Sequence, residues 1–144
     1  MPGPRLELAA LTTQVAREIR TVLDQRLGEH GLTSQQAGVL LHVSGGTTSP
    51  RKLAELLGTD TAGMTRLLDR LGEKGHITRH PDPTDRRAIT VELTRSGRKL
   101  LPVIQPAFEQ TAATATAGIS DADIRVAATV LGHILTTLAP ARSS

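Results

Sequence analysis

Residues 49–94 read SPRKLAELLGTDTAGMTRLLDRLGEKGHITRHPDPTDRRAITVELT, and this stretch decides the fold. Ser49 is a favourable N-cap, and Pro50 occupies the first helical position, where its missing N–H costs nothing. Apolar residues then recur at helical spacing as far as Gly58, which can adopt the left-handed conformation of a helix C-cap. The stretch therefore begins with a short helix between Ser49 and Gly58.

A second short helix follows at once. Thr59 or Asp60 caps it, and it ends near Gly75. Two helices joined by so tight a turn indicate a helix-turn-helix, whose second helix is built to lie in a DNA major groove. Small residues on that helix let the backbone approach the bases, and arginine offers a planar fork of donors to a guanine edge or a phosphate. Its polar face carries Thr61, Ala62, Thr65, Arg66, Asp69 and Arg70.

After the second helix the apolar residues alternate, which predicts a two-stranded hairpin. The alternation places Ile89, Val91 and Leu93 together on one face, which we expect to be buried. The turn between the strands carries Arg86 and Arg87. A strand pair with arginines at its tip beside a recognition helix indicates a wing, because arginine is favoured in a narrow, electronegative minor groove.

The run Asp85-x-Arg87-x5-Leu93-Thr94, after LAELLGTDTAGMTRLLDRLGEKGHI, resembles the winged-helix signature of the MarR family of bacterial transcription regulators. The resemblance covers residues 33–100 closely. It implies a mainly α fold with a small β-wing, in which a winged helix-turn-helix is flanked by N- and C-terminal dimerisation helices. It also implies a homodimeric regulator, most often a repressor, that binds a pseudo-palindromic operator. Many members release DNA when a small-molecule effector binds.

The same resemblance implies roles for the residues of the recognition helix and the wing. Arg87 would enter the minor groove, with Arg86 sharing the tip and Asp85 holding the Arg87 guanidinium in place; a purely structural clasp between Asp85 and Arg87 is compatible with this role. Asp69 should orient an arginine, because phosphate repels a bare carboxylate. Facing the major groove would be Thr61, Ala62, Thr65, Arg66 and Arg70.

The helix before the recognition helix would bind phosphate. Its first turn carries Ser49, Arg51 and Lys52. Backbone N–H groups at a helix N-terminus favour anions, so these side chains would act together with the helix end. Residues 51–99 contain eleven Lys and Arg against seven Asp and Glu, whereas the whole chain carries a net charge of only +3. This concentration of positive charge is expected of a surface that binds double-stranded DNA.

The flanking segments predict three further helices. Residues 6–27 carry an apolar stripe, which would serve either the domain's own core or a partner chain. In the helix after the wing, Pro102 and Pro106 predict a kink or break near 102–106, and the Thr/Ala-rich end over 111–117 is either helical or frayed. A last helix begins near residue 120 and ends at Pro140, before a disordered tail.

The length of 144 residues fits one compact unit. The resemblance divides it into an N-terminal dimerisation helix (1–32), the winged helix-turn-helix (33–95) and C-terminal dimerisation helices (96–144). The chain contains no cysteine, which excludes disulfides and thiolate metal sites. No apolar run approaches the length of a membrane span and no signal peptide is evident, so we expect a soluble cytoplasmic protein without membrane contact.

Other classes of function fit the sequence less well. It contains no Gly-rich phosphate loop, HExxH or GxSxG motif, so we expect no enzyme, cofactor or metal site. The acids Asp82 and Asp85 lie in a solvated turn, a poor place to raise a carboxyl pKa. A winged helix used for protein–protein contact remains the alternative, but its recognition helix would present an apolar patch. With Phe108 as the single aromatic residue, expected in the core, no aromatic-lined effector pocket is available.

Overall fold

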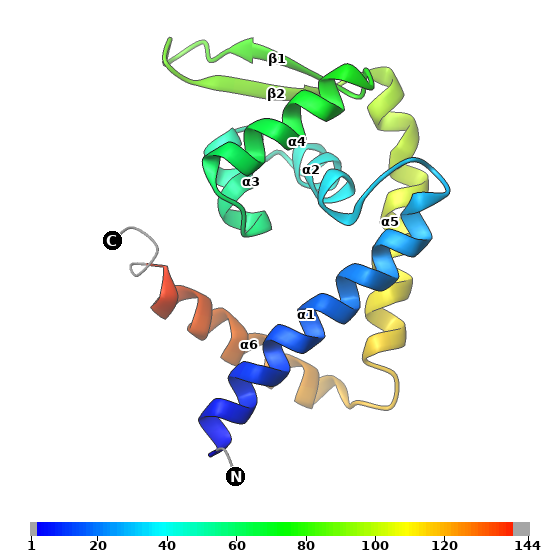
Figure 1. Ribbon diagram of the computed structural model, residues 1–144, viewed down its shortest axis with the longest axis vertical. Coiled ribbons are helices and arrows are strands. Elements are labelled where there is room, and N and C mark those ends of the chain that lie inside the picture. The colour runs from blue at the N-terminus through cyan, green and yellow to red at the C-terminus, as the bar shows by residue number, and fades with distance from the viewer. Residues whose placement is uncertain (1–2, 140–144) are drawn as a thin grey trace. The chain divides into compact units, whose positions relative to one another are not determined.

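The computed structural model describes residues 3–139 and confirms a mainly α fold with a small β-wing (Figure 1). The chain forms two compact units, Met1–Thr111 and Ala112–Ser144. The described elements are α1 (Pro4–Gly28), α2 (Ser34–Ser44), α3 (Pro50–Leu57), α4 (Thr61–Glu73), β1 (Ile77–Pro81), β2 (Ile89–Leu93), α5 (Arg95–Ala115) and α6 (Asp121–Leu138).

Local capping chemistry begins and ends the helices of the helix-turn-helix. Thr33 and Gln36 form a reciprocal capping box at the start of α2, and the Ser49 hydroxyl accepts a hydrogen bond from the Lys52 N–H at the start of α3. Gly58 ends α3 with φ +64°, in the left-handed region. Asp60, not Thr59, caps α4, because its carboxylate accepts the Gly63 N–H at 2.7 Å. The sequence prediction of two short helices and a tight turn is confirmed.

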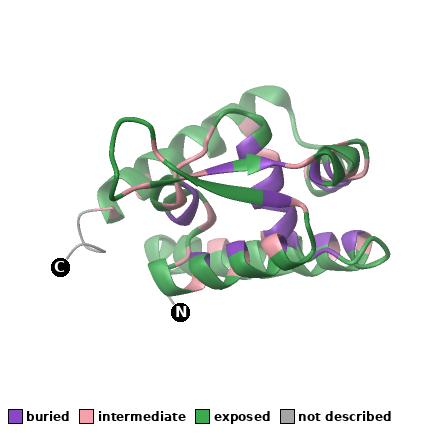
Figure 2. Ribbon diagram, turned by 90° about the horizontal axis from the view of Figure 1, so that it is seen from above, coloured by how far each residue is buried: buried purple, intermediate pink, exposed green. Residues whose placement is uncertain are grey.

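The core of the first unit lies where α1, α2, α3, α4, the wing strands and α5 meet. Figure 2 shows its buried residues on the inner sides of these elements. Phe108 is partly buried and packs against this core, as predicted. Burial of large aliphatic side chains is the main source of stability here. The largest fully buried side chains are Leu27, Leu40, Leu53, Met64, Leu71, Ile104, Val39 and Val91.

The wing is an antiparallel pair in which β1 and β2 run in register from Ile77↔Leu93 to Pro81↔Ile89. Val91 and Leu93 are buried as predicted, but Ile89 is 48% exposed, so the expectation that it is buried is wrong. Ile89 belongs to the last strand pair before the loop, beyond the part of the hairpin that packs on the core. The Val91 N–H also donates to the Thr48 carbonyl at 2.9 Å, which ties the wing to the loop before α3.

Helix α5 runs without a break through Pro102 and Pro106, so of the predicted kink or break near 102–106 the break is wrong. Both prolines lie on the exposed side of the helix. The carbonyls that lose an N–H partner, those of Arg98 and Pro102, also belong to exposed residues, where water can satisfy them. The Thr/Ala-rich segment is helical as far as Ala115.

The first turn of α5 packs tightly on the start of β1. The Thr94 N–H donates to the His76 carbonyl at 3.0 Å, and the Thr94 hydroxyl accepts the Gly97 N–H at 3.1 Å. Gly97 is buried, and a Cβ there would overlap the His76 carbonyl oxygen. The His76 ring contacts the Ser96 hydroxyl at 2.8 Å, and burial, together with nearby Lys74, lowers the pKa of His76. The glycine that weakens the helix locally is therefore required by packing.

In the second unit, Ser120 caps α6 by accepting the Asp123 N–H, and α6 contains no buried residue (Figure 2). By length and composition alone, Asp121–Ala139 could cross a membrane, with a mean hydropathy of 1.2, which departs from the expectation that no segment comes near. Five of its large apolar side chains are more than 40% exposed: Val126, Val130, Leu131, Leu135 and Leu138. Pro140 and the expected disordered tail lie outside the described residues.

Candidate nucleic-acid interface

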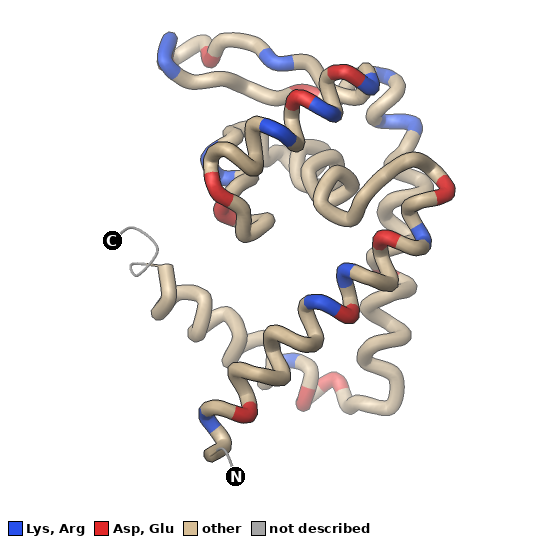
Figure 3. Tube along the Cα trace, in the orientation of Figure 1, with Lys and Arg blue, Asp and Glu red and all other residues tan. Residues whose placement is uncertain are grey.

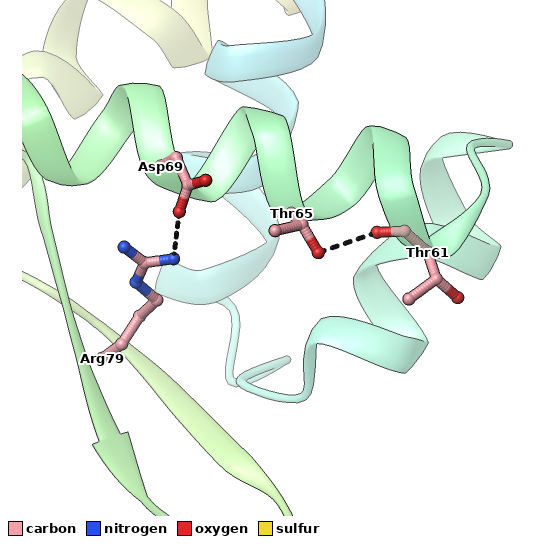
Figure 4. Close-up of polar contacts among 4 residues, drawn as sticks. All are labelled: Thr61, Thr65, Asp69 and Arg79. Carbon is pink, nitrogen blue, oxygen red and sulfur yellow. Dashed lines mark hydrogen bonds and ion pairs between the residues drawn. The ribbon is translucent and has the colours of Figure 1, made fainter.

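The polar face of α4 is open to solvent. The opposite face of α4 is buried in the core through Met64, Leu68 and Leu71. Helical geometry therefore turns the polar residues outward. The Thr65 hydroxyl donates to the Thr61 carbonyl at 3.0 Å (Figure 4), which fixes its side chain along the helix. All five residues predicted for the major groove are exposed, namely Thr61, Ala62, Thr65, Arg66 and Arg70.

Asp69 lies among these residues and pairs with the wing. Its carboxylate accepts a hydrogen bond from Arg79 Nη1 at 2.6 Å (Figure 4). That Asp69 orients an arginine was predicted, but the sequence did not identify Arg79 on β1 as its partner. Within residues 3–139, neither Arg66 nor Arg70 lies within salt-bridge distance of a carboxylate, so both guanidinium groups are available to a ligand.

Carboxylates inside the wing loop organise its tip. Asp82 accepts hydrogen bonds from the Thr84 N–H at 2.8 Å and the Thr84 hydroxyl at 2.7 Å, and these bonds lower the pKa of Asp82. Asp85 accepts the backbone N–H of Arg87 at 3.0 Å, instead of the guanidinium contact that we expected. Both arginine side chains of the tip are exposed, and Figure 3 shows the basic residues gathered there. The acids thus shape the turn and leave the arginines free.

A hollow of about 430 Å³, here called the α3–α4–wing hollow, brings the predicted residues of three elements together. Ser49 and Arg51 line it from the start of α3, Thr61 and Thr65 from α4, and Arg87 from the wing. Its apolar lining includes Ala54, Met64 and Ile89. The exposed Ile89, unexplained by the sequence alternation, therefore contributes to this surface. Arg51 lies 4.0 Å from Glu55, but both side chains are well exposed, so this pair holds Arg51 only weakly.

The remaining predicted residues lie outside that hollow. Arg66 and Arg70 line a hollow farther along α4 with Asp69, and Arg86 lines one under the wing with Arg79. Lys52 and Ala62 are exposed on their helices but line none of these hollows.

The C-terminal end of α4 is tied to the corner between α1 and α2. Lys74 Nζ donates to the Gly31 carbonyl at 2.5 Å and to Gln36 Oε1 at 3.2 Å. Gln36 is only 4% exposed, and the same amide oxygen accepts the Thr33 N–H. Because a buried amide is costly to leave without partners, this network holds α4 in one position. No local sequence pattern predicts this network, because its members come from three separate segments of the chain.

Among the described residues, no three or more His, Cys, Asp or Glu side chains lie together in a way that could hold a metal ion. The Asp24 carboxylate accepts the Ser34 N–H at 2.7 Å. This bond supports the start of α2 and links α1 to it.

Comparisons with known proteins agree with this geometry. Residues 30–88, which contain α2, α3, α4 and β1, match the profile described as the MarR family. The chain is 34% identical over 93 residues to the multiple antibiotic resistance protein MarR of Salmonella typhimurium, a match covering 64% of this chain and 65% of that relative.

Solved structures share the fold over nearly the whole chain. A MarR-family transcriptional regulator from Rhodococcus sp. RHA1 matches with a TM-score of 0.82 at 21% identity, covering 94% of this chain and 98% of that one. MepR of S. aureus, solved as a complex with DNA, matches with a TM-score of 0.77 at 25% identity, covering 90% of this chain and 97% of that one.

Proposed function

This chain belongs to the MarR family, and from that premise we propose that it is a sequence-specific transcription regulator that binds double-stranded DNA. We propose further that it binds a pseudo-palindromic operator as a homodimer and represses the adjacent gene. One observation carries the proposal: the start of α3, the polar face of α4 and the wing arginine Arg87 all line the α3–α4–wing hollow.

The chemistry of this surface suits a duplex. Thr61 and Thr65 allow α4 to approach base edges, and the unpaired Arg66 and Arg70 can bind guanine or phosphate. The start of α3 offers Ser49, Arg51 and Lys52 to phosphate together with the helix end. Arg87, at the end of an internally braced loop, would reach the minor groove beside the half-site.

The homodimer is supported by apolar surface that the single chain leaves uncovered. In α1, exposed apolar side chains recur at Leu8, Leu11, Val15 and Ile19. In α6, no residue is buried. Exposed stripes of this length usually mark interaction surfaces, and we assign residues 1–32 and 96–144 to dimerisation. A two-fold dimer sets two recognition helices about one DNA turn apart, which explains the expected operator symmetry.

Release by a small-molecule effector and action in the cytoplasm complete the proposal. Both rest on family membership alone. Phe108 packs against the core, so an effector pocket would be lined by aliphatic and polar side chains of this chain.

The proposal is tested by selecting bound sequences from a random duplex pool with the purified protein, followed by salt titration of the best binder. We expect an inverted repeat with half-sites about ten base pairs apart, and a steep fall of affinity with salt. Failure to enrich any sequence over non-specific binding would overturn specific recognition and favour the protein–protein alternative.

Replacing Arg87 with alanine should weaken operator binding by about tenfold to a hundredfold, because a minor-groove arginine is lost. The protein should remain a folded dimer, since the Arg87 side chain is exposed and only its backbone N–H is bonded within the loop. Fluorescence anisotropy at fixed salt measures the loss. Arg98→Ala, which removes an exposed arginine from α5, is the matched control and should leave affinity nearly unchanged. Equal affinities of the two variants would contradict the wing assignment.

A further inference from the structure

We propose that Asp69 and Arg79 form a strut between the recognition helix and the wing, and that this strut positions Arg87 for the minor groove. The inference rests on the proposed function and deepens it, because it assigns to both residues a positioning role without contact to DNA. It also explains why a carboxylate occupies the DNA-facing side of α4.

The contact is short and spans two elements. Arg79 Nη1 and Asp69 Oδ1 are 2.6 Å apart, and Figure 4 shows the guanidinium reaching from β1 to α4. The other terminal nitrogen of Arg79 would lie 3.6 Å from a Cβ placed on Gly72, so the guanidinium lies along the helix at this point. The Arg79 guanidinium on β1 therefore lies close to both Asp69 and Gly72 on α4.

The strut contacts the hairpin between its base in the core and its tip, so it can limit the movement of the tip. The hairpin is anchored in the core at its base, where Ile77 pairs with Leu93. Arg79 lies two residue pairs farther out, opposite Val91, and Arg87 lies beyond the end of the strands. Without the strut, the outer hairpin would depend on the strand ladder and the Val91–Thr48 bond. A small rotation at the base would then move Arg87 by a larger distance.

The strut's contribution is geometric and not one of stability. The side chains of Arg79 and Asp69 are 37% and 51% exposed, and ion pairs at such exposure stabilise a fold very little. In the absence of a positioning role, the Asp69 carboxylate would simply oppose the DNA phosphates. Removal of the Asp69 carboxylate should therefore weaken operator binding if the strut positions Arg87, and strengthen it if the carboxylate only repels phosphate.

The decisive variant is Asp69→Ala, compared with Glu73→Ala as its matched control. Both substitutions remove one negative charge from the exposed side of α4 and replace it with a strong helix former. Glu73 has no salt-bridge partner among the described residues. If charge alone matters, both variants bind the operator more tightly. If the strut operates, Asp69→Ala binds about tenfold more weakly while Glu73→Ala does not.

Two further measurements separate positioning from direct contact. The exchanged pair Asp69→Arg with Arg79→Asp restores the ion pair and should recover most of the lost affinity; no recovery would mean that Arg79 itself binds phosphate and would overturn the strut. In an Arg87→Ala background, Asp69→Ala should have almost no further effect, because there is no arginine left to position. Additive losses would likewise overturn it.

Binding by the unmodified protein is measured first, and its absence would overturn the proposed function itself. Specific binding by the unmodified protein, together with tighter binding by Asp69→Ala, would overturn only the strut.

Discussion

Introducing Leu131→Glu together with Leu135→Glu should convert the protein to a folded monomer that has lost operator affinity by about a thousandfold or more. Both leucines are already 41% and 65% exposed in the single chain, so glutamates there remain solvated and leave its core intact. In a dimer whose interface contains α6, two carboxylates would lose water without gaining partners. A monomer contacts one half-site only, which removes most of the specific binding energy.

Analytical ultracentrifugation and anisotropy with the selected operator measure the two effects on the same samples. Thr129→Glu with Thr136→Glu is the matched control, because both threonines are exposed on the other side of α6. The control should remain dimeric and bind DNA. A soluble monomer that retained operator affinity would contradict the dimer, and an unchanged dimer would remove this face of α6 from the interface.

Replacing Gly97 with alanine should destabilise the protein by about 3 kcal/mol, although alanine is the better helix former. A Cβ at this position would overlap the carbonyl oxygen of His76, which is held by the Thr94 N–H and cannot move away freely. Relief would require separating α5 from β1. The urea midpoint at fixed protein concentration measures the change.

Gly28→Ala provides the control for the glycine substitution. Gly28 is the last residue of α1, and a Cβ there meets nothing within 4 Å. Its midpoint should stay the same or rise, by up to about 1 kcal/mol in stability, because helical alanine is favoured over glycine. A Gly97→Ala midpoint equal to that of Gly28→Ala would refute the packing argument.

The features that sequence reasoning found are those decided within a few residues. The caps at Ser49 and Gly58 follow from side-chain and backbone chemistry inside one helical turn. The hairpin follows from alternation, and the exposure of the recognition face follows from the spacing of the core residues on α4. These local rules were sufficient to identify the winged helix and the residues expected to bind DNA.

The features that it missed depend on partners far away in the chain. The alternation of apolar residues does not show that the outer end of the hairpin, at Ile89, extends beyond the core. Proline rules assume that a lost hydrogen bond is costly, and they fail for Pro102 and Pro106 because water can reach the freed carbonyls. Neither Arg79 nor Gly97 is marked by a pattern in its neighbouring residues. Arg79 pairs with the Asp69 carboxylate on α4, and Gly97 packs against the carbonyl oxygen of His76, before β1.

The contacts of Lys74 have a thermodynamic consequence for regulation. They join the end of the recognition helix to Gly31, which follows α1, and to the buried Gln36 of α2. An event that tilts α1 cannot leave α4 undisturbed without breaking these bonds. Any molecule whose affinity depends on that tilt is therefore energetically linked to the operator. By reciprocity, the operator changes the affinity for that molecule by the same factor, so under the proposed function bound DNA would lower the affinity of the protein for an effector that releases it.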